Sequence, residues 1–120
     1  MEKPKKLIVE ASKKFFRREK EVVFAYLFGS QATGHAIAKS DVDIAVYLDP
    51  KKKQNQFEKR LALIAGLSKQ LKKEADVVIL NTAPPFLTHV VLKEGILLFD
   101  RDPSKRIARR RLDDRALPRT

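Results

Sequence analysis

Residues 29–46 read GSQATGHAIAKSDVDIAV, a stretch that joins a glycine-serine pair to two aspartates separated by one valine. Successive side chains of a strand point to opposite faces, so a strand through DVDIAV places Asp41 and Asp43 on one face, roughly 7 Å apart. Two carboxylates held this close repel each other unless a cation lies between them. Because hard divalent ions take oxygen ligands, the stretch predicts a magnesium site that serves nucleotide phosphates.

The glycine-serine pair supplies groups that hold a phosphate. Gly29 lets the backbone approach a phosphate oxygen closely, and Ser30 offers both a backbone N–H and a hydroxyl as donors. Nucleotidyl transfer depends mainly on positioning the phosphates and neutralising their charge with metal. We therefore interpret Gly29 and Ser30 as nucleotide-binding residues, and Asp41 and Asp43 as catalytic metal ligands.

A site with two metal ions calls for a further carboxylate from a neighbouring strand. Asp76 is the candidate, because it opens the apolar run DVVIL and is the only acid in it. A strand that begins there can bring Asp76 to the same edge of the sheet as Asp41 and Asp43. The alternative is a solvated turn residue at the end of a helix, with no part in the site.

Apolar patterns on both sides of this stretch predict an α/β (α+β) fold, a small mixed β-sheet flanked by helices. The first helix is expected to bury Leu7, Ile8, Ala11, Phe15 and Phe16. The second is expected to bury a stripe that begins with Phe57 and Leu61 and continues through Ile64, Leu67 or Ser68, and Leu71. The expected order is a helix at 5–20, strands at 22–28 and 42–48, a helix at 54–73, a strand at 76–80, a short helix ending near residue 95, a strand at 96–99, and a basic helix or frayed end from residue 103.

Two tyrosines fall in the predicted strands. Tyr26 reads as a core residue of a central strand that is covered on both faces. Tyr47 shares the face of the aspartates, which leaves two interpretations open, lining of a nucleotide pocket or ordinary packing.

The 120 residues, 43% of them hydrophobic, suffice for one compact domain spanning 1–120. No apolar run approaches the ~20 residues that a membrane span requires, and the N-terminus is charged rather than signal-like. A cytoplasmic protein is therefore expected. The absence of cysteine excludes disulfides and thiolate metal sites, so a bound metal must take oxygen or histidine ligands.

The sequence holds 26 Lys and Arg against 15 Asp and Glu, a formal net charge of +11. Such a surface attracts polyanions, among them nucleic acids and acidic proteins. The alternative is that the charged side chains are simply solvated and bind no particular partner. No aromatic residues interleave with the basic runs as a stacking platform for bases requires, so a nucleic-acid partner is not expected. Transfer of a nucleotide to the end of a nucleic acid is kept as a weaker hypothesis.

The chain resembles the minimal nucleotidyltransferases (MNT) of the DNA polymerase beta superfamily. The resemblance lies in the glycine-serine pair, in its spacing to DVD, and in the downstream run DVVILNTAPPFLTHVVLKEGILLFD. The resemblance covers nearly all of the chain and implies the polymerase-beta-like fold. It implies that Gly29 and Ser30 lie at the phosphates of ATP, that Asp41 and Asp43 bind magnesium, and that Asp76 completes a carboxylate set for two ions.

One position departs from the pattern of that superfamily. Many relatives carry an arginine before the second glycine of the loop, and here Thr33 precedes Gly34. His35 or Lys39, in the same loop, can replace that phosphate contact, or both can be solvated. No general base stands out, and Asp76 is the candidate to take a proton from the acceptor.

A chain this short resembles the MNT antitoxins that pair with a HEPN-domain ribonuclease toxin. This resemblance implies magnesium-dependent transfer of AMP from ATP to a tyrosine of the toxin, which neutralises it. A protein partner fits the physical requirement as well, because so short a chain has little means to position an acceptor hydroxyl by itself. The alternative is a non-catalytic antitoxin that neutralises its partner by binding and retains a vestigial nucleotide site.

Overall fold

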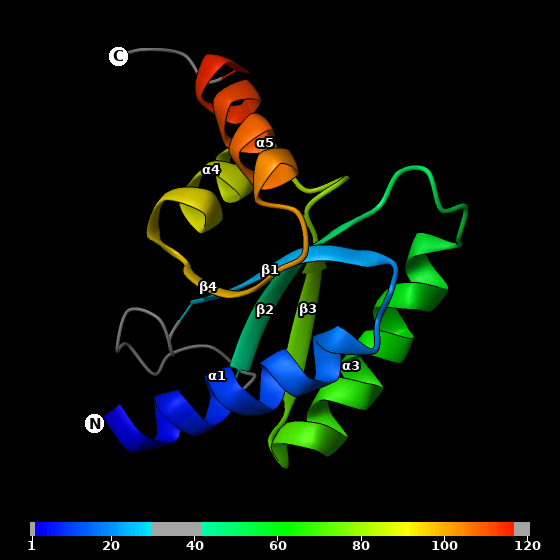
Figure 1. Ribbon diagram of the computed structural model, residues 1–120, viewed down its shortest axis with the longest axis vertical. Helices are drawn as coiled ribbons and strands as arrows, with labels where there is room; N and C mark the ends of the chain where they lie inside the picture. Colours follow the sequence, from blue (N-terminus) through cyan, green and yellow to red (C-terminus); the bar gives the residue numbers. More distant parts are fainter. Residues whose placement is uncertain (1, 30–41, 117–120) are drawn as a thin grey trace.

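The computed structural model describes residues 2–29 and 42–116, and it shows the order of helices and strands that the sequence predicts (Figure 1). The basic segment after residue 102 is a helix. No helix in these two ranges is long and apolar enough to cross a membrane. The elements are α1 (Glu2–Arg17), β1 (Val22–Phe28), β2 (Val42–Leu48), α3 (Gln56–Leu71), β3 (Ala75–Ile79), α4 (Pro85–Glu94), β4 (Ile96–Asp100) and α5 (Pro103–Ala116).

The four strands form one mixed sheet in the order β3-β2-β1-β4. β1 runs antiparallel to both β2 and β4, whereas β2 and β3 are parallel. The parallel pair follows from its connection, because α3 carries the chain back along the sheet between the two strands. The mixed sheet with flanking helices confirms the predicted fold, with β1 and β2 in the centre and β3 at one edge.

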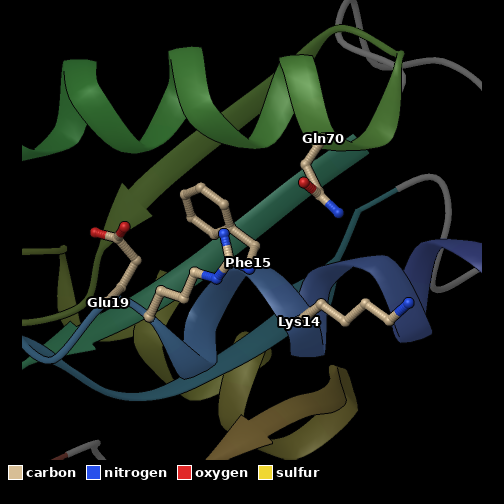
Figure 2. Close-up of a pocket in the computed structure, with 5 residues that line it drawn as sticks. Lys14, Phe15, Glu19 and Gln70 are labelled. Carbon is tan, nitrogen blue, oxygen red and sulfur yellow. The ribbon is translucent and has the colours of Figure 1, made fainter.

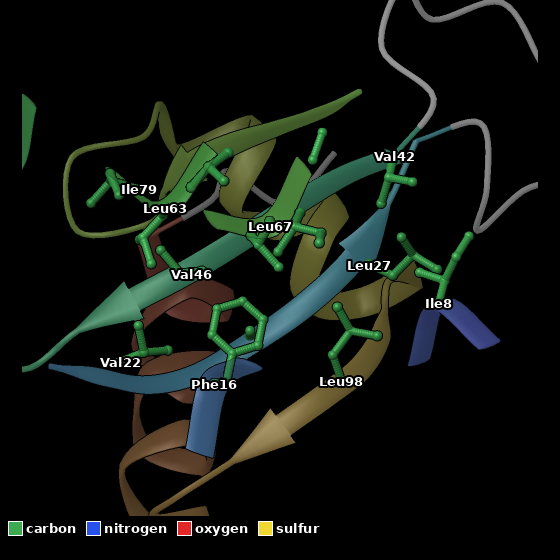
Figure 3. Packing of buried hydrophobic residues seen from close by; sticks show 14 of the residues in the cluster. Ile8, Phe16, Val22, Leu27, Val42, Val46, Leu63, Leu67, Ile79 and Leu98 are labelled. Carbon is green, nitrogen blue, oxygen red and sulfur yellow. The ribbon is translucent and has the colours of Figure 1, made fainter. Parts of the chain in front are cut away.

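Helices cover both faces of the sheet (Figure 1). Each face has its own hydrophobic cluster. α1 and α3 pack on one face, where Phe16, Leu63 and Leu67 meet the buried side chains of the strands (Figure 3). α4 supplies Val91 and Leu92 to the cluster on the other face. Because side chains alternate along a strand, every second side chain of β2 points to the first face. These side chains are Val42, Ile44, Val46 and Leu48.

Three apolar residues that the sequence assigns to the core are exposed. Leu7 is 69% exposed, Phe57 67% and Leu61 48%. In α3 the buried positions are Leu63 and Leu67. At 100° per residue, Phe57 lies about 120° and Leu61 about 160° around the helix from Leu63. The predicted stripe was therefore wrong over the first part of α3, although Ile64 and Leu71 do pack against the core.

Lys59 on α3 joins this helix to the segment between α1 and β1. Its Nζ donates to Glu19 Oε1 at 2.7 Å and to Glu21 Oε1 at 3.0 Å. The hydrogen bond from Lys59 is the main reason that the pKa of Glu21 is lowered. Burial opposes the charge of Lys59, but the bonds to both glutamates outweigh it and raise the pKa of Lys59.

This cluster predicts a pH dependence of stability. A glutamate whose pKa is lower in the folded state stabilises the fold above its unfolded pKa, and that contribution is lost as the pH falls through the folded value. We expect the free energy of unfolding to drop between about pH 5 and about pH 3, and the Lys59→Met variant to show a shallower drop. Urea titrations at several pH values measure this, with Lys51→Met, at an exposed position, as the control. Equal slopes for Lys59→Met and the unmodified protein would contradict the prediction.

Candidate active site

Two of the predicted acidic residues lie side by side on neighbouring strands. Asp43 of β2 and Asp76 of β3 are direct partners in the parallel register. Neighbouring strands are about 4.8 Å apart, and paired residues present their side chains on the same face. Val42 and Ile44, on either side of Asp43, are fully buried in the first cluster, so Asp43 faces the other side of the sheet. The structure thus places Asp43 and Asp76 together, as expected from the sequence.

Gly29 follows β1 and packs against the first of these carboxylates. Its φ is +75°, in the left-handed region that favours glycine. A Cβ at this position would lie 2.7 Å from Asp43 Oδ2, closer than real Cβ contacts come. Only a glycine therefore lets the chain leave β1 directly beside the Asp43 carboxylate.

Asp76 lies within β3 rather than in a turn, and Arg60 of α3 holds it. Arg60 Nη2 donates to Asp76 Oδ1 at 2.9 Å, and Arg60 Nε donates to the carbonyl oxygen of Val77 at 2.6 Å. The backbone N–H of Val77 donates to the same Asp76 Oδ1 at 2.9 Å. Because β3 is an edge strand, its outer backbone groups have no neighbouring strand to pair with in the described part of the chain. Arg60 satisfies one of them, the Val77 carbonyl oxygen, and also orients the Asp76 carboxylate.

Arg60 was not predicted from the sequence as part of the site. Its signal was available, because position 60 lies about 20° around the helix from Leu67, on the inward side of α3. A charged residue on that side requires a polar partner nearby. Asp76, at the start of the following strand, is such a partner.

Asp41 and Ser30 fall outside the described residues, as do Thr33, His35 and Lys39. Within residues 2–29 and 42–116, no group of three or more histidine and acidic side chains is arranged to hold a metal ion. The chemistry of the described donors nevertheless suits magnesium, which proteins usually bind through one or two carboxylates while phosphates and water complete its shell. Asp43 and Asp76 supply such oxygens from adjacent strands.

Both tyrosines take part in packing. Tyr26 is 4% exposed, which confirms it as a core residue. The ring of Tyr47 stacks on Phe24, with 5.0 Å between their centroids. Tyr47 belongs to the same face of β2 as Asp43 but lies towards the other end of the strand.

A cavity between α1 and α3 lies on the opposite side of the sheet (Figure 2). Its volume is about 290 Å³, and the residues around it include Phe15, Glu19 and Gln70. The face of the sheet beneath these helices carries the apolar side chains of β2 and β3, whereas Asp43 and Asp76 point to the other face. We therefore place the candidate site at Gly29, Asp43 and Asp76 and not in this cavity.

Comparison with known proteins gives an independent assignment. A family model described as "Polymerase beta, Nucleotidyltransferase" matches residues 10–104. A comparison with curated proteins found no match.

Among solved structures, the chain is similar to a chain of a toxin-antitoxin complex with AMP-PNP, with 24% identity, a TM-score of 0.73, and coverage of 89% of this chain and 84% of the other. It is similar to a chain of the toxin-antitoxin complex MntA-HepT, with 22% identity, a TM-score of 0.69 and coverage of 92% and 84%. It is also similar to a chain of the complex of tri-AMPylated Shewanella oneidensis HEPN toxin with MNT antitoxin. Here the identity is 22%, the TM-score is 0.71, and the match covers 92% of this chain and 83% of the other. At these identities the likeness shows the fold.

Proposed function

Because the chain belongs to the polymerase beta nucleotidyltransferase family, we propose that it is the antitoxin of a toxin-antitoxin pair, which transfers AMP from ATP to a tyrosine of a HEPN ribonuclease toxin. The observation that carries the proposal is the in-register pair of Asp43 and Asp76 beside Gly29. The similar structures support it, since one complex contains AMP-PNP and another an AMPylated HEPN toxin.

In this reaction the tyrosine oxygen forms a bond to the α-phosphorus of ATP, the bond from that phosphorus to the bridging oxygen breaks, and pyrophosphate leaves. Gly29 and Ser30 would hold the phosphates, and Asp41, Asp43 and Asp76 would hold magnesium. Bound magnesium would neutralise the charge on the phosphates and on the leaving pyrophosphate. Asp76 would also be the candidate to accept the phenolic proton, with its carboxylate directed by the hydrogen bond from Arg60.

The proposal is tested by incubating the protein with ATP labelled on the α-phosphate, magnesium and the product of the adjacent reading frame, which we expect to be a HEPN-domain protein. The label is expected on a tyrosine of the partner, and the ribonuclease activity of the partner is expected to fall in step with labelling. Mass spectrometry identifies the modified residue. Neutralisation without any transferred label would favour the non-catalytic alternative.

Arg60 provides a test of how the site is organised. The Arg60→Met variant keeps much of the side-chain volume but removes the bonds to Asp76 and to the Val77 carbonyl. We expect the rate of AMP transfer to fall about tenfold to a hundredfold, because a misdirected carboxylate loses the positioning that the reaction depends on. Arg60→Lys keeps the charge and should recover part of the rate.

Kinetic measurements distinguish a positioning role for Arg60 from a purely structural role. The loss in Arg60→Met should appear mainly in kcat, since Asp76 is the group that Arg60 orients. An unchanged kcat together with a lower free energy of unfolding would show that Arg60 serves only the edge of the sheet.

An apolar surface next to Arg60 is suited to the protein partner. Phe57 and Leu61 are exposed on α3, and Phe57 borders a cavity of about 290 Å³ that Arg60, Val77 and Ile79 also line. Large exposed apolar side chains that adjoin a cavity are typical of an interface. A partner bound there would lie next to the arginine that contacts Asp76, so this surface would bring an acceptor close to the carboxylates.

Phe57→Ser is therefore expected to weaken binding of the toxin by about ten- to a hundredfold, since a buried aromatic anchor typically contributes about 2 kcal/mol or more to an interface. The stability of the free antitoxin should change little because the ring is exposed. Isothermal titration calorimetry with the toxin measures the affinity. Leu112→Ser, at an exposed leucine of α5, is the matched control, and an equal loss in both variants would argue against this surface.

A further inference from the structure

A second polar pocket lies at the other end of β2. Its volume is about 410 Å³, within the range of ligand sites. We name it the Arg109 pocket. Its wall comes from the end of β2, the turn that follows, the start of α3, the turn after β3 and one residue of α5. It includes Tyr47, Asp49, Lys52, Lys53, Gln54, Asn81 and Arg109.

The Arg109 pocket is built around a positioned cation. The guanidinium of Arg109 lies over the ring of Tyr47, 5.6 Å from its centroid, and Nη2 donates to the carbonyl oxygen of Leu80 at 3.4 Å. Asn81 fixes the floor, because its amide accepts from the N–H of Leu48 and donates to the carbonyl oxygen of Leu48, both at 2.8 Å. A charge held in this way is better prepared to bind an anion than a freely rotating surface lysine.

The charges around the pocket are predominantly positive. Lys52 and Lys53 line it from the turn after β2, where Lys52 Nζ also donates to the carbonyl oxygen of Lys20 at 3.5 Å, and Arg109 lines it from α5. The one acid of the wall, Asp49, accepts from the N–H of Lys51 and has Lys105 Nζ at 3.9 Å from its Oδ1, so its charge is already partly balanced. Cations that approach a pocket from two sides favour a ligand with more than one negative group.

One neutral group in the wall has an unused acceptor. Gln54 Oε1 is buried and has no hydrogen-bond partner within the described part of the chain. A buried carbonyl oxygen left without a donor costs free energy, so a ligand that donates a hydrogen bond here is favoured. Inorganic phosphate at neutral pH is chiefly an acceptor, whereas the ribose 2′-hydroxyl beside a phosphodiester is a donor.

We propose that the Arg109 pocket binds single-stranded RNA, with Lys52, Lys53 and Arg109 at phosphates and Gln54 at a ribose hydroxyl. The site is separate from the candidate active site, because Asp43 and Leu48 lie near opposite ends of β2, roughly 16 Å apart along the strand. It goes beyond the proposed transfer of AMP and does not require it. The proposal departs from the sequence-based expectation that nucleic acid is not a partner. The contacts proposed here are to phosphates and a ribose hydroxyl and use no base-stacking platform.

Fluorescence anisotropy with a labelled oligouridine of about 12 nucleotides tests the proposal on the full chain. The double variant Lys52→Gln/Lys53→Gln is expected to bind at least about tenfold more weakly than the unmodified protein at physiological salt. The plot of log affinity against log salt should become shallower by about 0.7 for each phosphate that the variant no longer neutralises. Lys69→Gln/Lys73→Gln removes the same charge from exposed positions at the other end of α3 and should leave both quantities nearly unchanged.

Two competitors decide the chemical class of the ligand. An oligothymidine of equal length should bind more weakly than the oligouridine, and polyglutamate should not displace the RNA. The proposal is overturned if both lysine pairs have the same effect, if DNA binds as well as RNA, or if ATP without magnesium competes through Lys52 and Lys53, which would make the pocket part of a nucleotide site. Asp43→Asn should bind RNA normally, so failure here and failure of the proposed AMP transfer are distinguishable.

Discussion

Asp43→Asn is expected to lower the rate of AMP transfer to the toxin by at least about a thousandfold, which corresponds to roughly 4 kcal/mol of lost transition-state stabilisation. The change replaces one carboxylate oxygen by an amide nitrogen of nearly the same size, so packing against Gly29 is preserved while a proposed ligand for magnesium is removed. Transfer of label from ATP under single-turnover conditions measures the rate, and urea denaturation checks that the fold is intact.

Asp49→Asn is the matched control for Asp43→Asn. Asp49 directly follows β2 at its other end, where its Oδ1 accepts from the N–H of Lys51, and an asparagine retains that acceptor. The control should transfer AMP at nearly the normal rate. If Asp43→Asn neutralises the toxin as well as the unmodified protein does, the catalytic account fails. The antitoxin would then act by binding, for which we propose the surface around Phe57 and Leu61.

Alternation along the strands made the position of Asp43 predictable. The sequence places Val42, Ile44 and Val46 on one face and Asp43 on the other, and the structure reproduces that division. The prediction that Asp76 lies beside Asp43 had weaker support in the sequence. A single sequence shows that a predicted strand begins with an acid, but it does not show which strand pairs with it. The parallel register of β2 and β3 depends on the path of α3 and on packing across the sheet.

The exposed residues of α3 and the role of Arg60 show where sequence patterns reach their limit. Phe57, Leu61 and Ile64 form an apolar series at helical spacing, yet the helix is rotated so that Leu63 and Leu67 are buried. Arg60 lies on the buried side and reaches the edge of β3. A pattern of apolar residues identifies a helix, but the rotation of that helix about its axis is decided by the polar bonds and the shape of the sheet it meets. The same rotation exposes the apolar surface proposed for the partner.

Gly29→Ala is expected to impair both stability and activity. The residue has a φ of +75°, where an L-residue costs about 1–2 kcal/mol, and the added Cβ would meet Asp43 Oδ2 at 2.7 Å. Relief of that contact requires the Asp43 carboxylate to move. We therefore expect the free energy of unfolding to fall by about 1–2 kcal/mol and the rate of AMP transfer to fall about a hundredfold or more, since a displacement of about 1 Å in a catalytic group has an effect of that size.

Lys72→Gly separates the backbone contribution of Gly29→Ala from the displacement of the carboxylate. Lys72, with a φ of 55° at the end of α3, is another left-handed residue and lies outside the carboxylate site. A glycine there should raise the free energy of unfolding by about 0.5–1 kcal/mol without changing transfer. In the double variant Gly29→Ala/Lys72→Gly, stability should return towards that of the unmodified protein while the rate of transfer stays low. Recovery of transfer along with stability would mean that Gly29 serves the fold alone, whereas a persistent loss assigns to it the placement of the Asp43 carboxylate.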